Sequence, residues 1–127
     1  KMQMSTKIIK KNKEKLVEIE KERGRLIRFL LNDCKLVEGS LRDSLIRCGR
    51  QGCHCEKEPI HLVTRISRWI DGRLKNKVVR VADREWVKIL SGNYKKSKKA
   101  LSDLIKLNED ERETIKTLIK LRTIKYE

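Results

Sequence analysis

Residues 48–61 read Cys-Gly-Arg-Gln-Gly-Cys-His-Cys-Glu-Lys-Glu-Pro-Ile-His and hold three of the four cysteines, both histidines and the only proline of the 127-residue chain. Thiolates and imidazoles are the usual ligands of zinc, which takes four of them at the corners of a tetrahedron. The sequence therefore predicts one structural Zn²⁺ site formed by Cys48, Cys53, Cys55 and His61. His54 is an alternative fourth ligand, although its place between two cysteines directs its side chain elsewhere. The other interpretation is three buried thiols beside two ordinary histidines.

The same stretch argues against a catalytic metal. A catalytic zinc keeps one coordination position open for water and has a carboxylate nearby. Glu56 and Glu58 are close in sequence, but four protein ligands close the coordination shell. A thiol redox role is disfavoured as well, because no Cys-x2-Cys pair opens a helix. We predict that the protein is not an enzyme.

Long charged segments on both sides of this stretch have the pattern of helices. The first runs from about residue 5 to 37, and apolar residues recur along it at coiled-coil spacing. Asp83 is a suitable N-cap for a second helix that continues toward the C-terminus, with a possible break near Asn108. The two helices are long enough to pair antiparallel, within one chain or between two copies. We interpret Cys34 as a small core side chain.

Two shorter elements are predicted between the helices. The motif Ser40-Leu-Arg-Asp43 resembles a capping box that opens a short helix, which would end at Gly49 and deliver Cys48. Segments 61–69 and 74–81 alternate in polarity, and Asp71-Gly72 is a strong turn signal between them. We therefore expect a two-stranded β-hairpin whose loop is slightly longer than two residues.

The predicted fold is mostly α. An N-terminal long helix (1–38) and a C-terminal long helix (83–127) form antiparallel, coiled-coil-like arms. They flank a small zinc-stapled module (39–82) with a short helix and a two-stranded β-hairpin.

Composition indicates a polyanionic partner. The chain has 33 Lys and Arg residues against 18 Asp and Glu residues, a formal net charge of +15. Such an excess favours nucleic acid first and an anionic membrane second. No apolar run approaches the roughly 18 residues that a membrane span needs, so we expect no membrane partner. The lysine-rich start, without a signal-peptide pattern, predicts a cytoplasmic protein.

Basic residues are densest in the predicted hairpin. Arginine forks fit phosphates and guanine edges, and a β-ribbon can enter a major groove. Each charge taken alone is better explained by solubility, and only their number in one hairpin favours binding. The candidate nucleic-acid contacts are Arg47, Arg50, Arg65, Arg68, Trp69, Arg73, Lys75, Lys77, Arg80, Lys95, Lys96, Lys98 and Lys99.

One pattern spans the region from Gly39 to about Leu107. It comprises Gly39-Ser40, Cys48-Gly49, Gly52-Cys53, Cys55, His61, a basic hairpin around Gly72 and a long helix from Asp83. This pattern resembles an uncharacterised family of small prokaryotic proteins often linked with mobile elements. The resemblance implies the same four ligands and no known activity.

The leading hypothesis is a nucleic-acid-binding protein, for DNA in preference to RNA, acting as an accessory or regulatory factor of a mobile element. The alternative is a coiled-coil assembly or adaptor protein whose zinc module only caps a helical bundle. Either way, the helices could make the protein a homodimer or a subunit of a larger assembly. A metal-dependent nuclease is a third hypothesis, but it lacks a convergent set of carboxylates.

Overall fold

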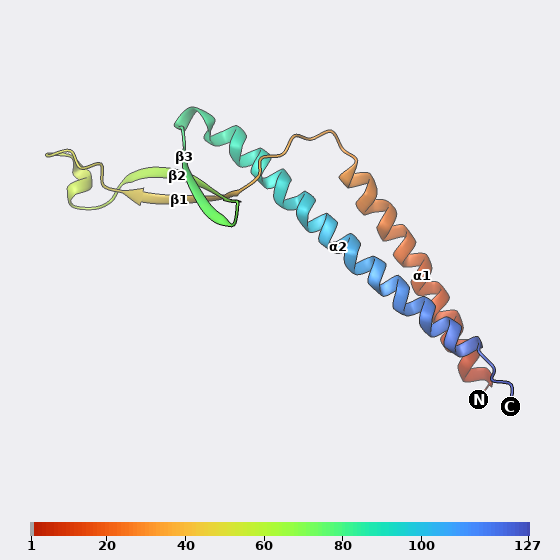
Figure 1. Cartoon of the computed structure of the whole chain (residues 1–127). Coiled ribbons are helices and arrows are strands. Elements are labelled where there is room, and N and C mark those ends of the chain that lie inside the picture. Colours follow the sequence, from red (N-terminus) through yellow and green to blue (C-terminus); the bar gives the residue numbers. More distant parts are fainter. Residues whose placement is uncertain (1) are drawn as a thin grey trace. The chain divides into compact units, whose positions relative to one another are not determined.

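The computed structural model describes residues 2–127, with side chains from Thr6 onward (Figure 1). Its elements in chain order are α1 (Met2–Leu30), β1 (Ser40–Ile46), the 3-10 turn η1 (His54–Glu56), β2 (His61–Ile70), β3 (Arg73–Val79), the 3-10 turn η2 (Val81–Asp83) and α2 (Arg84–Arg122). They form two compact units, one of residues 34–96 and one of residues 1–33 with 97–127. Residue 1, which belongs to the predicted 1–38 segment, lies outside the described residues.

The helical unit consists of α1 and the C-terminal part of α2, which lie side by side and run antiparallel (Figure 1). Its buried side chains include Ile19 and Leu26 of α1 and Ala100 and Thr114 of α2. The helix α2 continues without interruption past Asn108. Within residues 2–127, neither helix has a stretch apolar and long enough to cross a membrane.

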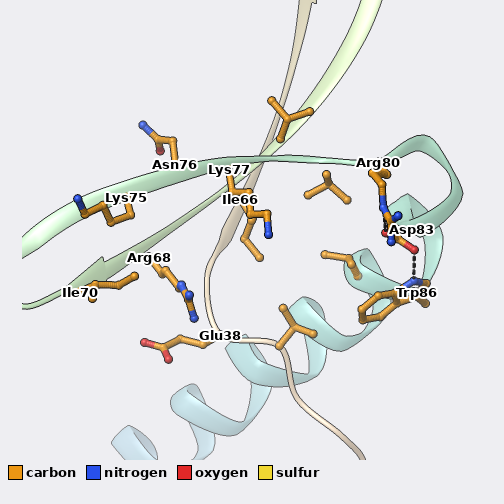
Figure 2. Close-up of a pocket in the computed structure, with 14 residues that line it drawn as sticks. Glu38, Ile66, Arg68, Ile70, Lys75, Asn76, Lys77, Arg80, Asp83 and Trp86 are labelled. Carbon is orange, nitrogen blue, oxygen red and sulfur yellow. Dashed lines mark hydrogen bonds and ion pairs between the residues drawn. The ribbon is translucent and has the colours of Figure 1, made fainter.

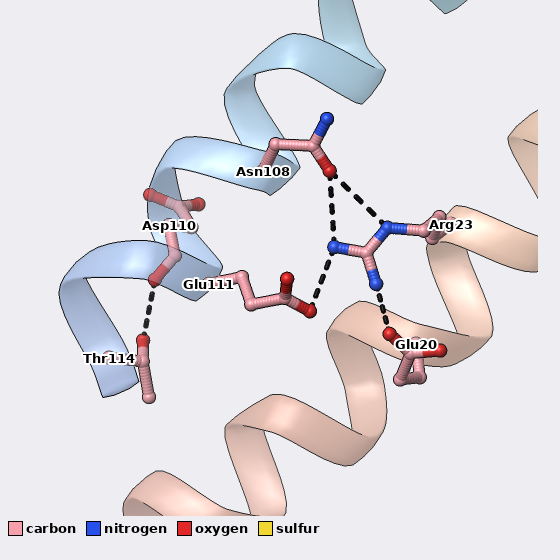
Figure 3. Close-up of polar contacts among 6 residues, drawn as sticks. All are labelled: Glu20, Arg23, Asn108, Asp110, Glu111 and Thr114. Carbon is pink, nitrogen blue, oxygen red and sulfur yellow. Dashed lines mark hydrogen bonds and ion pairs between the residues drawn. The ribbon is translucent and has the colours of Figure 1, made fainter. Parts of the chain in front are cut away.

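A polar cluster joins the two helices of this unit (Figure 3). The guanidinium of Arg23 donates to the Asn108 side-chain oxygen over 3.3 and 3.1 Å. It also forms an ion pair with Glu111 at 2.8 Å and a second one with Glu20. The Arg23 side chain is only 17% exposed, and each of its three guanidinium nitrogens has a partner. Charge-assisted, bidentate contacts of this kind fix the register of the two helices.

The other unit is built on a three-stranded antiparallel sheet in the order β1-β2-β3. Strand β1 pairs with β2 from Ser40 opposite Ser67 to Ile46 opposite His61. The turn between β2 and β3 is the two-residue loop Asp71-Gly72, shorter than expected, with φ of +51° and +76°. Positive φ at both loop residues matches the right-handed twist of the strands, which is why Asp-Gly suits this turn.

The expected fold is wrong at residues 40–46 and in the number of strands. Residues 40–46 form strand β1 and not a short helix, so the sheet has three strands where a two-stranded hairpin was predicted. The order of elements between the helices therefore differs from the predicted one. Leu41 and Leu45 misled the prediction, because residues four apart share a face in a helix and also in a strand.

The first helix is shorter than predicted and ends at Leu30 instead of near Val37. The backbone N–H of Asn32 donates to the Phe29 carbonyl oxygen at 3.2 Å, and its side-chain amide donates to the same oxygen. An asparagine side chain that bonds to a nearby backbone carbonyl in this way competes with the hydrogen bonds of the helix.

Residues 84–96, the part of α2 that belongs to this unit, pack against one face of the sheet and form the core with it. Thr64 and Val79 are buried on the sheet, and Val87 and Ser91 are buried on the helix. The Ser91 hydroxyl donates to the Gly39 carbonyl oxygen at 3.0 Å. This core is small, so the unit depends on few contacts.

Gly39 offers a test of this packing. Its φ is +133°, and a Cβ there would lie 2.6 Å from Cγ1 of Ile66. We expect Gly39→Ala to lower the free energy of unfolding by about 1–3 kcal/mol, through backbone strain and this clash. Urea denaturation followed by circular dichroism measures the change.

Gly92→Ala is the matched control, because Gly92 lies inside α2 and a Cβ there meets no atom within 4 Å. It should leave stability unchanged or raise it by up to about 1 kcal/mol. Equal destabilisation by both variants would contradict the predicted role of Gly39.

Candidate metal centre

Strand pairing brings the first and last predicted ligands to one end of the sheet. Ile46, the last residue of β1, lies opposite His61, the first residue of β2. Cys48 follows Ile46 by two residues, so it lies next to the start of β2. The 14 residues 47–60 between the strands hold the other two cysteines.

This loop turns sharply around the cysteines. Gly49 and Gly52 have φ of +79° and +80°, values that glycine adopts without steric cost. Cys53 precedes η1 and Cys55 lies within it, while the Gly52 N–H donates to the Glu56 carboxylate at 2.9 Å. The loop thus folds back so that its cysteines face the strand ends.

Four potential metal-ligand atoms meet at this point. One atom each from Cys48, Cys53, Cys55 and His61 lies within 4.8 Å of all the others. The Sγ atoms of Cys48 and Cys55 are 3.3 Å apart, and Cys53 Sγ is 3.3 Å from His61 Nε2. The structure thus brings together all four residues predicted as ligands, and the group includes His61 but not His54. This arrangement is compatible with a metal site.

The thiols differ in their environment. Hydrogen bonds lower the pKa of Cys53 to about 6, first from the backbone N–H of Cys55 and then from the side chains of His61, Cys55 and Cys48. The Cys48 amide, 3.2 Å from Cys55 Sγ, lowers the pKa of Cys55, but burial and the neighbouring thiols outweigh it and raise that pKa overall. Cys55 has no exposed surface. A thiol that ionises near neutral pH is prepared to bind a metal cation.

The candidate nucleic-acid residues of the hairpin are divided between two faces of the sheet. Side chains alternate along a strand, so Arg65 and Trp69 share one face of β2 and Arg68 lies on the other. Figure 2 shows the second face, where Arg68 extends toward Glu38 beside a cavity of about 690 Å³ between the sheet and α2. The other candidate residues of the hairpin on this helix-facing side are Arg73, Lys75 and Lys77.

The other candidates lie outside the strands. Arg47 and Arg50 are exposed in the loop 47–60, which holds the cysteine cluster of Cys48, Cys53, Cys55 and His61. Arg80 follows β3 and forms an ion pair with Asp83 at 2.9 Å. Lys95 and Lys96 belong to the sheet unit. Lys98 and Lys99 belong to the helical unit, and Lys99 pairs with Asp103 at 3.2 Å.

The candidate nucleic-acid contacts predicted from the sequence omitted one basic residue of the sheet, Arg42. Arg42 lies directly opposite Arg65, on the face that α2 does not cover, and it is exposed. Its assignment to a short helix removed it from the predicted basic surface. No local signal identifies a strand there, because the spacing of Leu41 and Leu45 fits a helix as well as a strand.

The two histidines give a matched test of the cluster. Cobalt(II) in a tetrahedral thiolate and imidazole site absorbs strongly in the visible range, so it reports on these four ligands. We expect His61→Ala to weaken cobalt binding at least tenfold and to change the spectrum. His54→Ala should leave both unchanged. Equal effects of the two variants, or none, would contradict the assignment of His61.

Comparison with known proteins gives one family. A search of curated proteins and a search of solved structures both find no match. Residues 8–89, which include the cysteine cluster and all three strands, match a family described as a domain of unknown function, DUF6788. The match spans 82 of the 127 residues and agrees with the expected resemblance to an uncharacterised family. The chain therefore belongs to the DUF6788 family.

Proposed function

We propose that the protein binds nucleic acid through the open face of its sheet, the face not covered by α2. The observation that carries this proposal is a pair of like charges, Arg42 and Arg65, directly opposite each other on that face. A second pair, Arg68 and Lys75, lies opposite on the helix-facing side. Like charges in directly opposed positions destabilise an antiparallel sheet. A bound polyanion would offset this repulsion, because its negative charge attracts both arginines.

The unit offers few acidic groups to neutralise these charges. Among the described residues, no ion pair involves Arg42, Arg65, Arg68 or Lys75. Asp43 is the only acidic residue within the strands, and its carboxylate accepts a hydrogen bond from the Thr64 hydroxyl at 2.7 Å. The positive field of the sheet is thus available to an external partner.

The chemistry of the residues favours phosphate as the anion. Arg42 and Arg65 present planar guanidinium forks that donate in a bidentate manner to phosphate oxygens. Such contacts position a nucleic-acid backbone without reading its bases. The open face therefore suits sequence-tolerant binding, and base contacts would come from its other side chains.

We further propose that the bound metal is zinc and that its role is structural. Zn–S bonds of about 2.3 Å and Zn–N bonds of about 2.0–2.1 Å in a tetrahedron separate the ligand atoms by about 3.6–3.8 Å. The two measured separations of 3.3 Å are a few tenths of an ångström shorter, within reach of a small side-chain adjustment. Three thiolates with one imidazole are a common closed set for structural zinc. The ion would tie the loop 47–60 to the ends of β1 and β2.

Metal analysis tests the zinc proposal. Untagged protein should contain about one equivalent of zinc. Cys55→Ser should lose it, and its unfolding temperature should fall by more than about 10 °C, because metal-binding energy contributes directly to folding. Cys34→Ser is the control and should retain the metal, since Cys34 is outside the cluster; it is exposed, so its interpretation as a core side chain is wrong. Less than half an equivalent of zinc in the unmodified protein would refute the site.

A salt titration tests nucleic-acid binding. We expect affinity for oligonucleotides to fall steeply with salt concentration as counterions are released. The double variant Arg42→Gln with Arg65→Gln should lose roughly tenfold in affinity, about 1.4 kcal/mol. It should also reduce the salt slope by about 1.4–1.8, the value for two lost phosphate contacts. Thermal stability should not fall, because the variant removes a repulsive pair.

The control changes net charge equally in the other unit. Lys106→Gln with Lys120→Gln removes two exposed positive charges of the helical unit. Affinity should change less than threefold. Equal losses in the two double variants would show that net charge, and not the open face of the sheet, determines binding.

A further inference from the structure

The tip of the β2–β3 hairpin extends beyond the end of β1, the other strand of the sheet. Strand β1 pairs with β2 only as far as Ser67, so residues 68–70 and 73–75 form a two-stranded ribbon. Three cross-strand pairs make up this tip. Two of them place basic side chains on the helix-facing side, and the middle pair, Trp69 with Leu74, lies on the open face.

Trp69 and Leu74 form an exposed apolar pair. The Trp69 side chain is 68% exposed and Leu74 is 50% exposed. Among the described residues, the Trp69 indole N–H has no hydrogen-bond partner, whereas the indole of the other tryptophan, Trp86, donates to Asp83 at 3.0 Å. A hydrogen bond within the fold thus holds the Trp86 indole, whereas the Trp69 indole is free to contact a partner. An exposed tryptophan beside a leucine is characteristic of an interaction surface.

The open face continues from this pair to the two opposed arginines. Arg65 and Trp69 are four residues apart on β2, which corresponds to roughly 13 Å along the strand. Arg42 lies beside Arg65 on the neighbouring strand. The face therefore combines an aromatic ring at one end with two guanidinium groups further along it.

This combination of side chains suits single-stranded nucleic acid better than a duplex. The faces of bases in a duplex are covered by stacking, so a flat tryptophan ring gains little from them unless the duplex is distorted. In a single strand the base faces are free to stack on an aromatic side chain while basic residues hold the backbone. We propose that the open face binds single-stranded nucleic acid, with one base stacked on Trp69. This inference rests on the proposed function and specifies its substrate class.

The two tryptophans provide the means to test it. The chain contains only these two, so Trp86→Phe makes Trp69 the sole indole fluorophore. The zinc-loaded 127-residue variant is titrated with a 15-nucleotide oligothymidine and with a 15-base-pair duplex at one salt concentration. We expect strong quenching and at least tenfold tighter binding with the single strand. Without Trp86→Phe, Trp69→Ala should weaken single-strand binding roughly tenfold, and Trp69→Phe should retain most of the affinity.

The outcomes separate this inference from the proposed function. Single-strand binding that leaves Trp69 fluorescence and the affinity of Trp69→Ala unchanged would overturn the stacking contact alone. Tighter binding of the duplex would overturn the substrate class but not the proposed function. Absence of binding to either oligonucleotide would refute the proposed function itself. Quenching only by vesicles of phosphatidylserine and phosphatidylcholine would refute both proposals and assign the apolar pair to a membrane surface.

Discussion

The register of β1 against β2 is the constraint on which the sheet unit depends. It sets Ile46 opposite His61 and thereby carries Cys48 to the start of β2. The same register decides which side chains face α2 and which face solvent. A slip of one residue would turn every β1 side chain to the opposite face. Asp43 would then lose its hydrogen bond with Thr64, and Arg42 would leave the open face. The cluster of Cys48, Cys53, Cys55 and His61 and the basic face therefore share one structural origin.

This register is maintained by a small number of interactions at different points along the strands. The buried core of the unit is limited to a few side chains of the sheet and of α2. Gly39 fits closely against Ile66 near the start of β1, and the Ser91 hydroxyl bonds to the Gly39 carbonyl. The cysteine cluster acts at the opposite end, where β1 enters its long loop. A bound metal ion would stabilise a unit with so small a core, because coordination energy supplements apolar burial.

Sequence patterns predicted the local features of this protein better than its long-range pairing. The Cys-x4-Cys-x-Cys-x5-His spacing identified the four clustered residues, since chemical type is explicit in the sequence. The Asp71-Gly72 turn was recognised because it depends on two neighbouring residues only. Strand β1 was missed, since a segment seven residues long with Leu41 and Leu45 satisfies both helical and strand periodicity. Its conformation is decided by hydrogen bonds to β2, whose paired residues are 15 to 27 positions further along the chain, and no local pattern records that pairing.

The strand order also leaves two unpaired edges, one on β1 and one on β3. Exposed edges of this kind tend to pair with other chains and to start aggregation. Strand β3 is exposed along most of its length, yet it carries Arg73, Lys75 and Lys77. Copies of the chain that approach edge to edge would bring these positive charges together. The residues that give the sheet its positive field thus also protect it from self-association as an extended sheet, and salt that screens them would weaken this protection.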